Sequence, residues 1–144
     1  MSIEGDVEVP FVSHLGFEMV QFDGGTSEMR YEARPEHLNS HGITHGGASM
    51  ALMDVAMARA ARSVQKDMGV VTIEIKTTFM RPARGILTAR GRLLHRTLAM
   101  AFTEGSIFDA QGRLCVHATG TFKYVKRAAS AHVGAGNPPA VTTD

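Results

Sequence analysis

The sequence is poor in the residues that mark several specialised classes of protein. Its 144 residues include one cysteine and no tryptophan, and aromatic residues make up only 6% of the chain. A single cysteine, Cys115, excludes an internal disulfide framework and fits a reducing compartment. We expect this cysteine to be a core residue of a strand rather than a reactive thiol.

Neither sign of charge dominates the chain. Lysine and arginine number 15 and the acidic residues 14, which gives a formal charge of +1, and the basic residues are spread along the sequence. No nucleic-acid-binding surface is therefore expected. A hydrophobic content of 44% and a charged content of 20% are those of an ordinary globular chain, and the length fits one domain.

Long apolar runs are missing as well. The longest, residues 48–58, is too short to span a bilayer and is interrupted by Asp54. The first eight residues are acidic and have no apolar segment of the kind found in secretory signals. We expect no membrane association and a cytoplasmic location.

Composition divides the chain into three parts. Residues 1–10 are predicted to form a flexible N-terminal arm that ends at Pro10. Residues 128–144, rich in alanine, glycine, proline and threonine, are predicted to form a disordered tail. The folded domain is expected to comprise residues 11–127.

Within the domain, hydrophobic periodicity predicts two strands, a loop, one long helix and four more strands. The expected ranges are strands at 17–22 and 26–33, a loop at 35–44, a helix at 46–65, and strands at 70–80, 86–95, 100–108 and 114–125, the last four connected as a meander. In the strand at 70–80, a period of two places Val71, Ile73, Ile75 and Phe79 on one face.

A single helix on a long antiparallel sheet leaves a sheet edge and one helix face to be covered. In a chain of this size the usual solution is self-association. We therefore expect at least a homodimer.

The predicted helix opens with His45-Gly46-Gly47 and carries one acid, Asp54, in an apolar stretch with no charged partner at helical spacing. A helix N-terminus offers unpaired amide donors and the positive end of the dipole. Two exposed amides and an unpaired carboxylate form a candidate catalytic set.

Helix geometry separates the two halves of this set. Gly46 and Asp54 are eight residues apart, which is about 12 Å along a helix axis. One helix therefore cannot bring both groups to one substrate atom. If they act on the same carbonyl, they must come from two helices that run antiparallel across a two-fold axis, with two equivalent sites in each dimer.

The spacing of these residues is similar to a known family. The pattern Asn39-x5-His45-Gly46-Gly47-x6-Asp54, with Thr72 and Phe79-Met80-Arg81-Pro82-Ala83 after it, resembles the hotdog-fold acyl-CoA thioesterases of the phenylacetate-pathway (PaaI-like) branch over most of residues 12–126. The resemblance implies an α+β hotdog fold, in which a long central helix packs on an antiparallel sheet. It also implies a dimer or a dimer of dimers that hydrolyses an acyl- or aryl-CoA thioester to the free acid and CoA, without metal or organic cofactor.

The resemblance also implies a role for each motif residue. Asp54 would be the catalytic carboxylate, either as general base toward water or as nucleophile, and the sequence leaves both open. The backbone N–H of Gly46 would polarise the thioester carbonyl. Asn39 and His45 would orient the thioester or shape the loop, and His45 could instead cap the helix. The Thr72 hydroxyl would hold the water.

Substrate contacts are expected from residues beside these groups. Gly47 would contact the substrate, and Arg81, Arg84 and Arg96, at or near turns, would bind the phosphates of CoA. Met50, Met53 and Met57 could line an acyl pocket or belong to the core. Chain length and preference for aromatic groups stay open.

Other chemistries are less well supported by the residues. His37, His41 and His45 recur every four residues, but Gly42 and the Asn39-Ser40 pair predict a loop there, and no metal is expected. A hydratase would need an Asp-x4-His pair, which we do not find. A non-catalytic acyl-CoA-binding or regulatory hotdog module remains the alternative, against which Asp54 counts.

Overall fold

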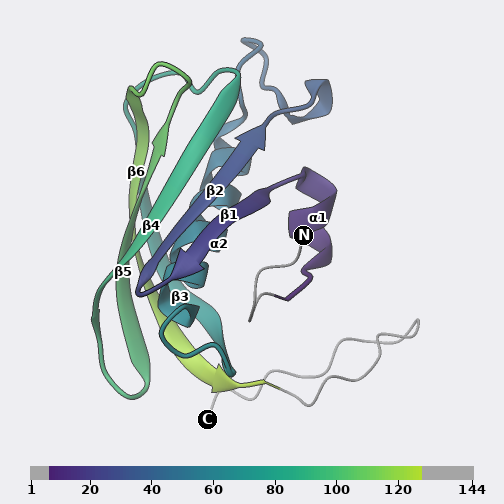
Figure 1. Cartoon of the computed structure of the whole chain (residues 1–144). Helices are drawn as coiled ribbons and strands as arrows, with labels where there is room; N and C mark the ends of the chain where they lie inside the picture. Colours follow the sequence, from purple (N-terminus) through teal and green to yellow (C-terminus); the bar gives the residue numbers. More distant parts are fainter. Residues whose placement is uncertain (1–6, 128–144) are drawn as a thin grey trace.

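The computed structural model describes residues 7–127, and the arm and tail predicted at 1–6 and 128–144 lie outside them. One long helix packs against one face of a curved six-stranded antiparallel sheet (Figure 1), so the predicted hotdog architecture is confirmed. In chain order the elements are α1 (Pro10–Leu15), β1 (Glu18–Asp23), β2 (Thr26–Glu32), the short 3-10 helix η1 (Pro35–His37), α2 (Gly46–Arg62), β3 (Met68–Phe79), β4 (Ile86–Arg96), β5 (Met100–Phe108) and β6 (Leu114–Lys126).

Helix α2 ends at Arg62, three residues before the predicted end at residue 65. Ser63 caps it: its hydroxyl donates to the Ala60 carbonyl at 2.7 Å and accepts from the Gly25 N–H at 2.8 Å. The β1–β2 turn thus holds the C-terminal end of α2 in place. No helix in the described part of the chain is long and apolar enough to span a membrane.

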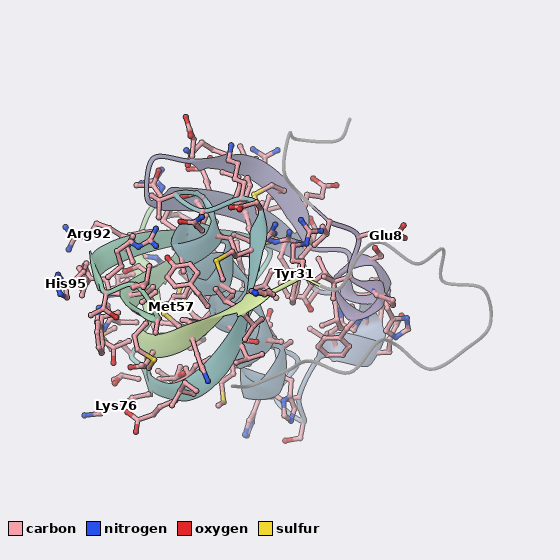
Figure 2. The ribbon with its side chains drawn as sticks, turned by 90° about the horizontal axis from the view of Figure 1, so that it is seen from below. Glu8, Tyr31, Met57, Lys76, Arg92 and His95 are labelled. Carbon is pink, nitrogen blue, oxygen red and sulfur yellow. The ribbon has the colours of Figure 1, made fainter. Side chains whose placement is uncertain are left out.

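The helix lies very close to the sheet because both surfaces carry small residues. A β-carbon at Gly91 of β4 would lie 2.4 Å from the Ala56 carbonyl oxygen, and the Ser27 hydroxyl donates to that same oxygen at 2.5 Å. Met53 and Met57 of α2 are fully buried, and Figure 2 shows Met57 between helix and sheet. These two methionines are therefore core residues, whereas Met50 is 44% exposed.

The strand order is β1-β2-β4-β5-β6-β3, so the predicted four-strand meander is wrong at its first connection. Strand β3 pairs with β6 and β4 pairs with β2, and only β4, β5 and β6 form a meander. The reason is that α2 carries the chain across the sheet before β3 begins. Strand β3 is consequently an edge strand.

The segment between β3 and β4 recrosses the sheet at the end where α2 begins. The N–H groups of Met80 and Arg81 donate to the Cys115 carbonyl at 2.8 and 3.2 Å, and the Thr44 N–H donates to the Ala83 carbonyl at 3.1 Å. These bonds fix the crossing segment against β6 and against the loop before α2. Cys115 is fully buried in β6, as predicted.

A bulge in β3 overturns the predicted alternation of that strand. The register to β6 shifts between Thr72 and Glu74, which leaves Ile73 as the extra residue, 56% exposed. Because a bulge inserts one extra residue, even-numbered side chains that face the helix before it are followed by odd-numbered ones after it. Thr72 therefore shares the helix-facing side with Ile75 and Phe79, and Val71 does not.

A short helix, α1, was not predicted and begins at Pro10, whose missing N–H costs nothing at a first helical position. Val12 of α1 is buried. The described end of the predicted arm contacts α2, since the Arg59 guanidinium donates to the Val7 carbonyl at 3.3 Å. Val7 thus contacts α2, whereas residues 8–10 are exposed.

Candidate active site

At the start of α2, one backbone N–H group has no hydrogen-bond acceptor within residues 7–127, whereas two such groups were expected. His45 is the N-cap, and its Nδ1 accepts a hydrogen bond from the Gly47 N–H at 2.8 Å. The side chain of His45 therefore caps the helix in this chain, the second of the roles considered for it. Gly47 lies on the exposed side of this turn, and its amide is not available to a substrate.

The Gly46 N–H donates to no acceptor among the described residues. The position that a β-carbon would take at Gly46 lies 3.4 Å from two ring atoms of Phe79, at the end of β3. Glycine leaves this amide accessible beside an aromatic ring. A donor at a helix N-terminus can stabilise negative charge that develops on a substrate oxygen.

Asn39 organises the loop that leads to α2. Its side-chain oxygen accepts from the backbone N–H groups of His41 and Ile43, at 2.9 and 3.3 Å. The side-chain oxygen of Asn39 is thus used within the loop, and its amide nitrogen is available for other contacts. Asn39 and Gly46 line the same pocket.

Asp54 lies halfway along α2 and is held from the sheet. The Thr72 hydroxyl of β3 donates to Asp54 Oδ1 at 2.7 Å, and no cation forms an ion pair with this carboxylate among the described residues. Burial raises the pKa of Asp54 above its ordinary value, and the Thr72 hydrogen bond partly offsets that rise. A desolvated carboxylate with one oxygen fixed and the other open is suited to act as a base or a nucleophile.

Two separate pockets contain these groups. The first, the amide pocket, has a volume of about 410 Å³ and is lined by Asn39, Gly46 and Phe79 among others. The second, the acid pocket, has a volume of about 300 Å³ and is lined by Asp54 and Thr72 among others. The two pockets share no residue, as expected from the distance between Gly46 and Asp54 along the helix.

The three arginines expected to bind phosphates do not lie together. Arg81 lines the amide pocket, where its guanidinium also donates to the Leu114 carbonyl at 2.9 Å. Arg84 is exposed on the crossing segment. Arg96 lines neither pocket: it stacks on the Tyr124 ring, with 4.6 Å from Cζ to the ring centroid, and donates to Gln65 beyond the C-terminal end of α2.

The three histidines of the η1 region have different environments. The Tyr31 hydroxyl and the buried His37 Nδ1 are hydrogen-bonded at 2.7 Å, His45 caps α2, and His41 is exposed. Within residues 7–127 no three histidine, cysteine or acidic side chains are grouped so as to hold a metal ion.

Sequence reasoning missed two polar residues of the amide pocket, Thr44 and Ser49, both buried. Ser49 is one helical turn after Gly46, so its spacing could have indicated the same side of α2. Thr44 gave no such signal, because only the fold of the loop turns its hydroxyl inward.

Comparisons with known proteins show the family of this chain. Residues 41–116, more than half of the chain, match the thioesterase superfamily. A candidate esterase of Saccharolobus solfataricus is 28% identical over 109 residues, which cover 75% of this chain and 73% of that protein.

Solved structures show the same fold. A candidate thioesterase of Ralstonia eutropha, described as related to phenylacetic acid degradation, is 29% identical with a TM-score of 0.75 and covers 81% of this chain and 92% of its own. The Escherichia coli PaaI protein from the phenylacetic acid degradation operon is 23% identical with a TM-score of 0.75, covering 80% of this chain and 83% of its own, and shows the fold alone. With its long helix on a six-stranded sheet, this chain belongs to the thioesterase superfamily and is a PaaI-like hotdog thioester hydrolase.

Proposed function

We propose that this protein hydrolyses acyl-CoA thioesters in a homodimer, at sites that combine Asp54 of one subunit with Gly46 of the other. The observation that carries the proposal is the pair of incomplete pockets. One holds a desolvated carboxylate without an amide donor, and the other holds an unengaged amide donor without a carboxylate.

The free edge of β3 gives the two pockets a way to meet. Strand β3 pairs only with β6 among the described strands, so the backbone groups of its other edge are open for a partner. A second copy that pairs antiparallel at this edge across a two-fold axis would extend the sheet through both subunits. In the same step α2 of each subunit would be brought beside its counterpart.

One register of such a pairing would bring the two pockets together. A two-fold axis near Lys76 opposes Thr72 of one subunit to Phe79 of the other, because the bulge at Ile73 absorbs one residue. Opposed residues lie on the same face, about 5 Å apart. Thr72 is hydrogen-bonded to Asp54, and the Phe79 ring lies beside Gly46, so this register would bring the carboxylate and the amide together across the interface.

The chemistry follows from the groups so assembled. Asp54 takes a proton from water, the water oxygen attacks the thioester carbonyl carbon, and the Gly46 N–H stabilises the oxyanion of the tetrahedral intermediate. Collapse of the intermediate breaks the carbon–sulfur bond and releases the CoA thiolate and the acid. The Thr72 hydroxyl fixes the carboxylate. The Asn39 amide and Arg81, which line the amide pocket, would contact the CoA portion.

Direct attack by Asp54 would give a mixed anhydride with the acyl group, which water would then hydrolyse. Both routes need the ionised carboxylate and the same amide donor. A binding or regulatory module is the second candidate function, and it would need neither.

The test is release of free CoA thiol from a panel of short-chain, long-chain and aromatic acyl-CoAs. Wild type should turn over at least one member, and Asp54→Asn and Asp54→Ala should lose most of that turnover while still binding the substrate. If wild type hydrolyses no member of the panel, or if Asp54→Asn retains full activity, the enzymatic proposal is wrong.

A second pair of variants tests the amide donor. Gly46 is the first residue of α2 and follows an extended residue, His45, so proline is structurally compatible there. Gly46→Pro removes the N–H and should lower kcat by about 10²- to 10³-fold, the usual effect of losing one oxyanion donor. The matched control, Gly46→Ala, keeps the N–H and should retain far more activity; equal losses in both variants would contradict the assigned role.

A further inference from the structure

Resting on the proposed function, we propose that His37 is a positioning residue for the reaction. Its ring, anchored to Tyr31, holds the base of the loop that ends at the Gly46 amide. His37 is not one of the residues that carry the family resemblance, and it takes no part in the chemical steps above.

The ring nitrogen Nδ1 of His37 accepts two hydrogen bonds. The backbone N–H of Arg34 donates to it at 3.2 Å, and the Tyr31 hydroxyl lies 2.7 Å from it. A backbone N–H can only donate, so Nδ1 carries a lone pair rather than a proton, and the Tyr31 hydroxyl is the second donor. The ring proton is therefore on Nε2.

The other ring nitrogen makes no hydrogen bond in the described part of the chain. Nε2 of His37 is buried and has no partner there, and the residue as a whole is 8% exposed. A buried donor without an acceptor lowers stability, and an apolar side chain would fill this space without that penalty. The Nδ1 acceptor is therefore what distinguishes His37 from a residue that only packs.

Tyr31 ties this ring to the sheet. It belongs to β2, is fully buried, and is packed edge-on by Phe17 with 4.8 Å between the ring centroids. The His37 ring stacks on Tyr31 with centroids 5.8 Å apart and an angle of 29° between the planes. The position of His37 is thus set by the hydrophobic core rather than by the surface loop that follows it.

The backbone of His37 carries this position to the start of α2. Its carbonyl accepts a hydrogen bond from the His45 N–H at 2.9 Å, which closes residues 38–44 into a loop. His45 is the N-cap of α2 and directly precedes Gly46. Two successive contacts therefore connect the core to the Gly46 amide: Tyr31 to the His37 ring, and the His37 carbonyl to His45.

An oxyanion donor must be held to within about 0.5 Å of its productive position. Without the Nδ1 acceptor, the Arg34 N–H and the Tyr31 hydroxyl would lose their acceptor, and the base of the loop would shift until they found another. The Gly46 N–H would shift with it. Because this amide acts on the transition state, kcat should fall by a larger factor than KM rises.

Two substitutions at His37 separate its acceptor from its packing. His37→Asn keeps an acceptor atom on Cγ, where Nδ1 is attached, and loses Nε2, which has no partner within residues 7–127. His37→Leu fills the space without an acceptor. In acyl-CoA hydrolysis His37→Leu should lower kcat roughly 10- to 100-fold, whereas His37→Asn should stay within about threefold of wild type. Equal losses in the two variants would overturn the proposal.

A matched pair of tyrosines provides the control for a merely structural effect. The Tyr124 hydroxyl donates to the Ala61 carbonyl near the C-terminal end of α2 at 2.7 Å, the same distance as at Tyr31, and both tyrosines are buried. Tyr31→Phe should lower kcat about two- to tenfold, the range for one hydrogen bond. Tyr124→Phe should lower the melting temperature by a similar amount and leave kcat unchanged; an equal loss of kcat there would contradict the role of His37. This pair serves also if His37→Leu does not fold.

Hydrogen exchange measures the positioning without catalysis. In His37→Leu the protection factors of the amides of residues 37–45 should fall at least about tenfold, while those of β5 and β6 stay the same. In His37→Asn both sets should keep their protection. Nitrogen NMR of the wild-type ring should place the proton on Nε2. A proton on Nδ1, or unchanged protection in His37→Leu, would overturn the proposal.

The positioning role and the enzymatic function fail separately. Local loss of protection in His37→Leu, together with no hydrolysis of any acyl-CoA by wild type, would keep the positioning of the Gly46 amide and reject the enzymatic function. Full kcat in a His37→Leu protein whose loop has lost protection would keep the function and reject the role of His37.

Discussion

Asp54 is a carboxylate on an apolar helix face with a single hydrogen-bond donor, the Thr72 hydroxyl. Its raised pKa means that folding favours the protonated form, so the stability associated with this group is present below its unfolded pKa and is lost as the pH rises through the folded pKa. At neutral pH, the ionised Asp54 therefore lowers the free energy of unfolding. A costly group retained in a pocket is typical of a functional site.

Thr72→Val should move the acidic limb of the pH–activity profile to higher pH. The hydrogen bond from Thr72 lowers the pKa of Asp54, so its loss raises that pKa further, and the ionised form that catalysis needs appears only at higher pH. The measurement is kcat/KM for acyl-CoA hydrolysis as a function of pH. Thr78→Val, the same change on the outer, exposed face of β3, is the control and should leave the limb in place. An unmoved limb in Thr72→Val contradicts this role.

At the scale of single residues, the motif predicted some of the observed contacts and missed others. The spacing identified Asp54, Thr72 and Gly46, and the structure joins the first two directly. It could not show that His45 uses the Gly47 amide, because capping depends on a rotamer. The spacing also could not show that Arg96 lies near the C-terminal end of α2, because a position near a turn does not say at which end of the sheet that turn lies.

Strand β3 combines three tasks in twelve residues: it positions Asp54 through Thr72, lies over Gly46 through Phe79, and leaves one edge unpaired. Its outer face carries polar side chains, and Lys76 points away from the helix, as do Arg92 and His95 of β4 (Figure 2). The proposed register places Lys76 at the two-fold axis.

A residue on a two-fold axis faces its own copy, so a single cysteine there can cross-link the dimer. Oxidation of Lys76→Cys should give a disulfide-linked dimer, since side chains directly opposed in antiparallel strands have β-carbons about 4.5–5.5 Å apart, near the separation that a disulfide requires. The readout is a non-reducing gel. Arg90→Cys, on the outer face of the interior strand β4, should stay monomeric on that gel; equal cross-linking of both, or of neither, contradicts the register.

The ranges of the helix and strands could be predicted from the sequence, but the order of the strands in the sheet could not. Local periodicity gave all six strands and α2 to within three residues, because each pattern is contained in its own segment. The pairing of β4 with β2 depends on contacts far apart in sequence, such as the close approach of Gly91 to Ala56. The bulge at Ile73 has no local signature, since valine and isoleucine suit either face of a strand.

For the whole molecule, a shared site means that neither subunit can be active alone. In the proposed dimer, each chain contributes an acid pocket to one site and an amide pocket to the other. If one chain has a defective acid pocket and its partner has a defective amide pocket, both defects fall in the same site and the other site stays intact. A site built within a single chain would not show this behaviour.

Mixing two inactive variants should restore activity. Asp54→Asn inactivates only the acid pocket, and Gly46→Pro inactivates only the amide pocket. Their heterodimer therefore has one intact site and one doubly defective site. Unfolding and refolding an equal mixture should recover about a quarter of wild-type activity, because half of the dimers are mixed and each has one of two sites. The control is each variant refolded alone. No recovery, with mixed dimers demonstrated by differential tagging, would place the site within one chain.

The unpaired edge of β3 has a further consequence for how such an enzyme would respond to its own abundance. When catalysis and association use the same strand, the monomer is inactive. Dilution below the dimer dissociation constant then makes activity fall more steeply than protein concentration. A cell that lowers expression of this protein modestly would then lose thioester hydrolysis disproportionately, without any regulatory ligand.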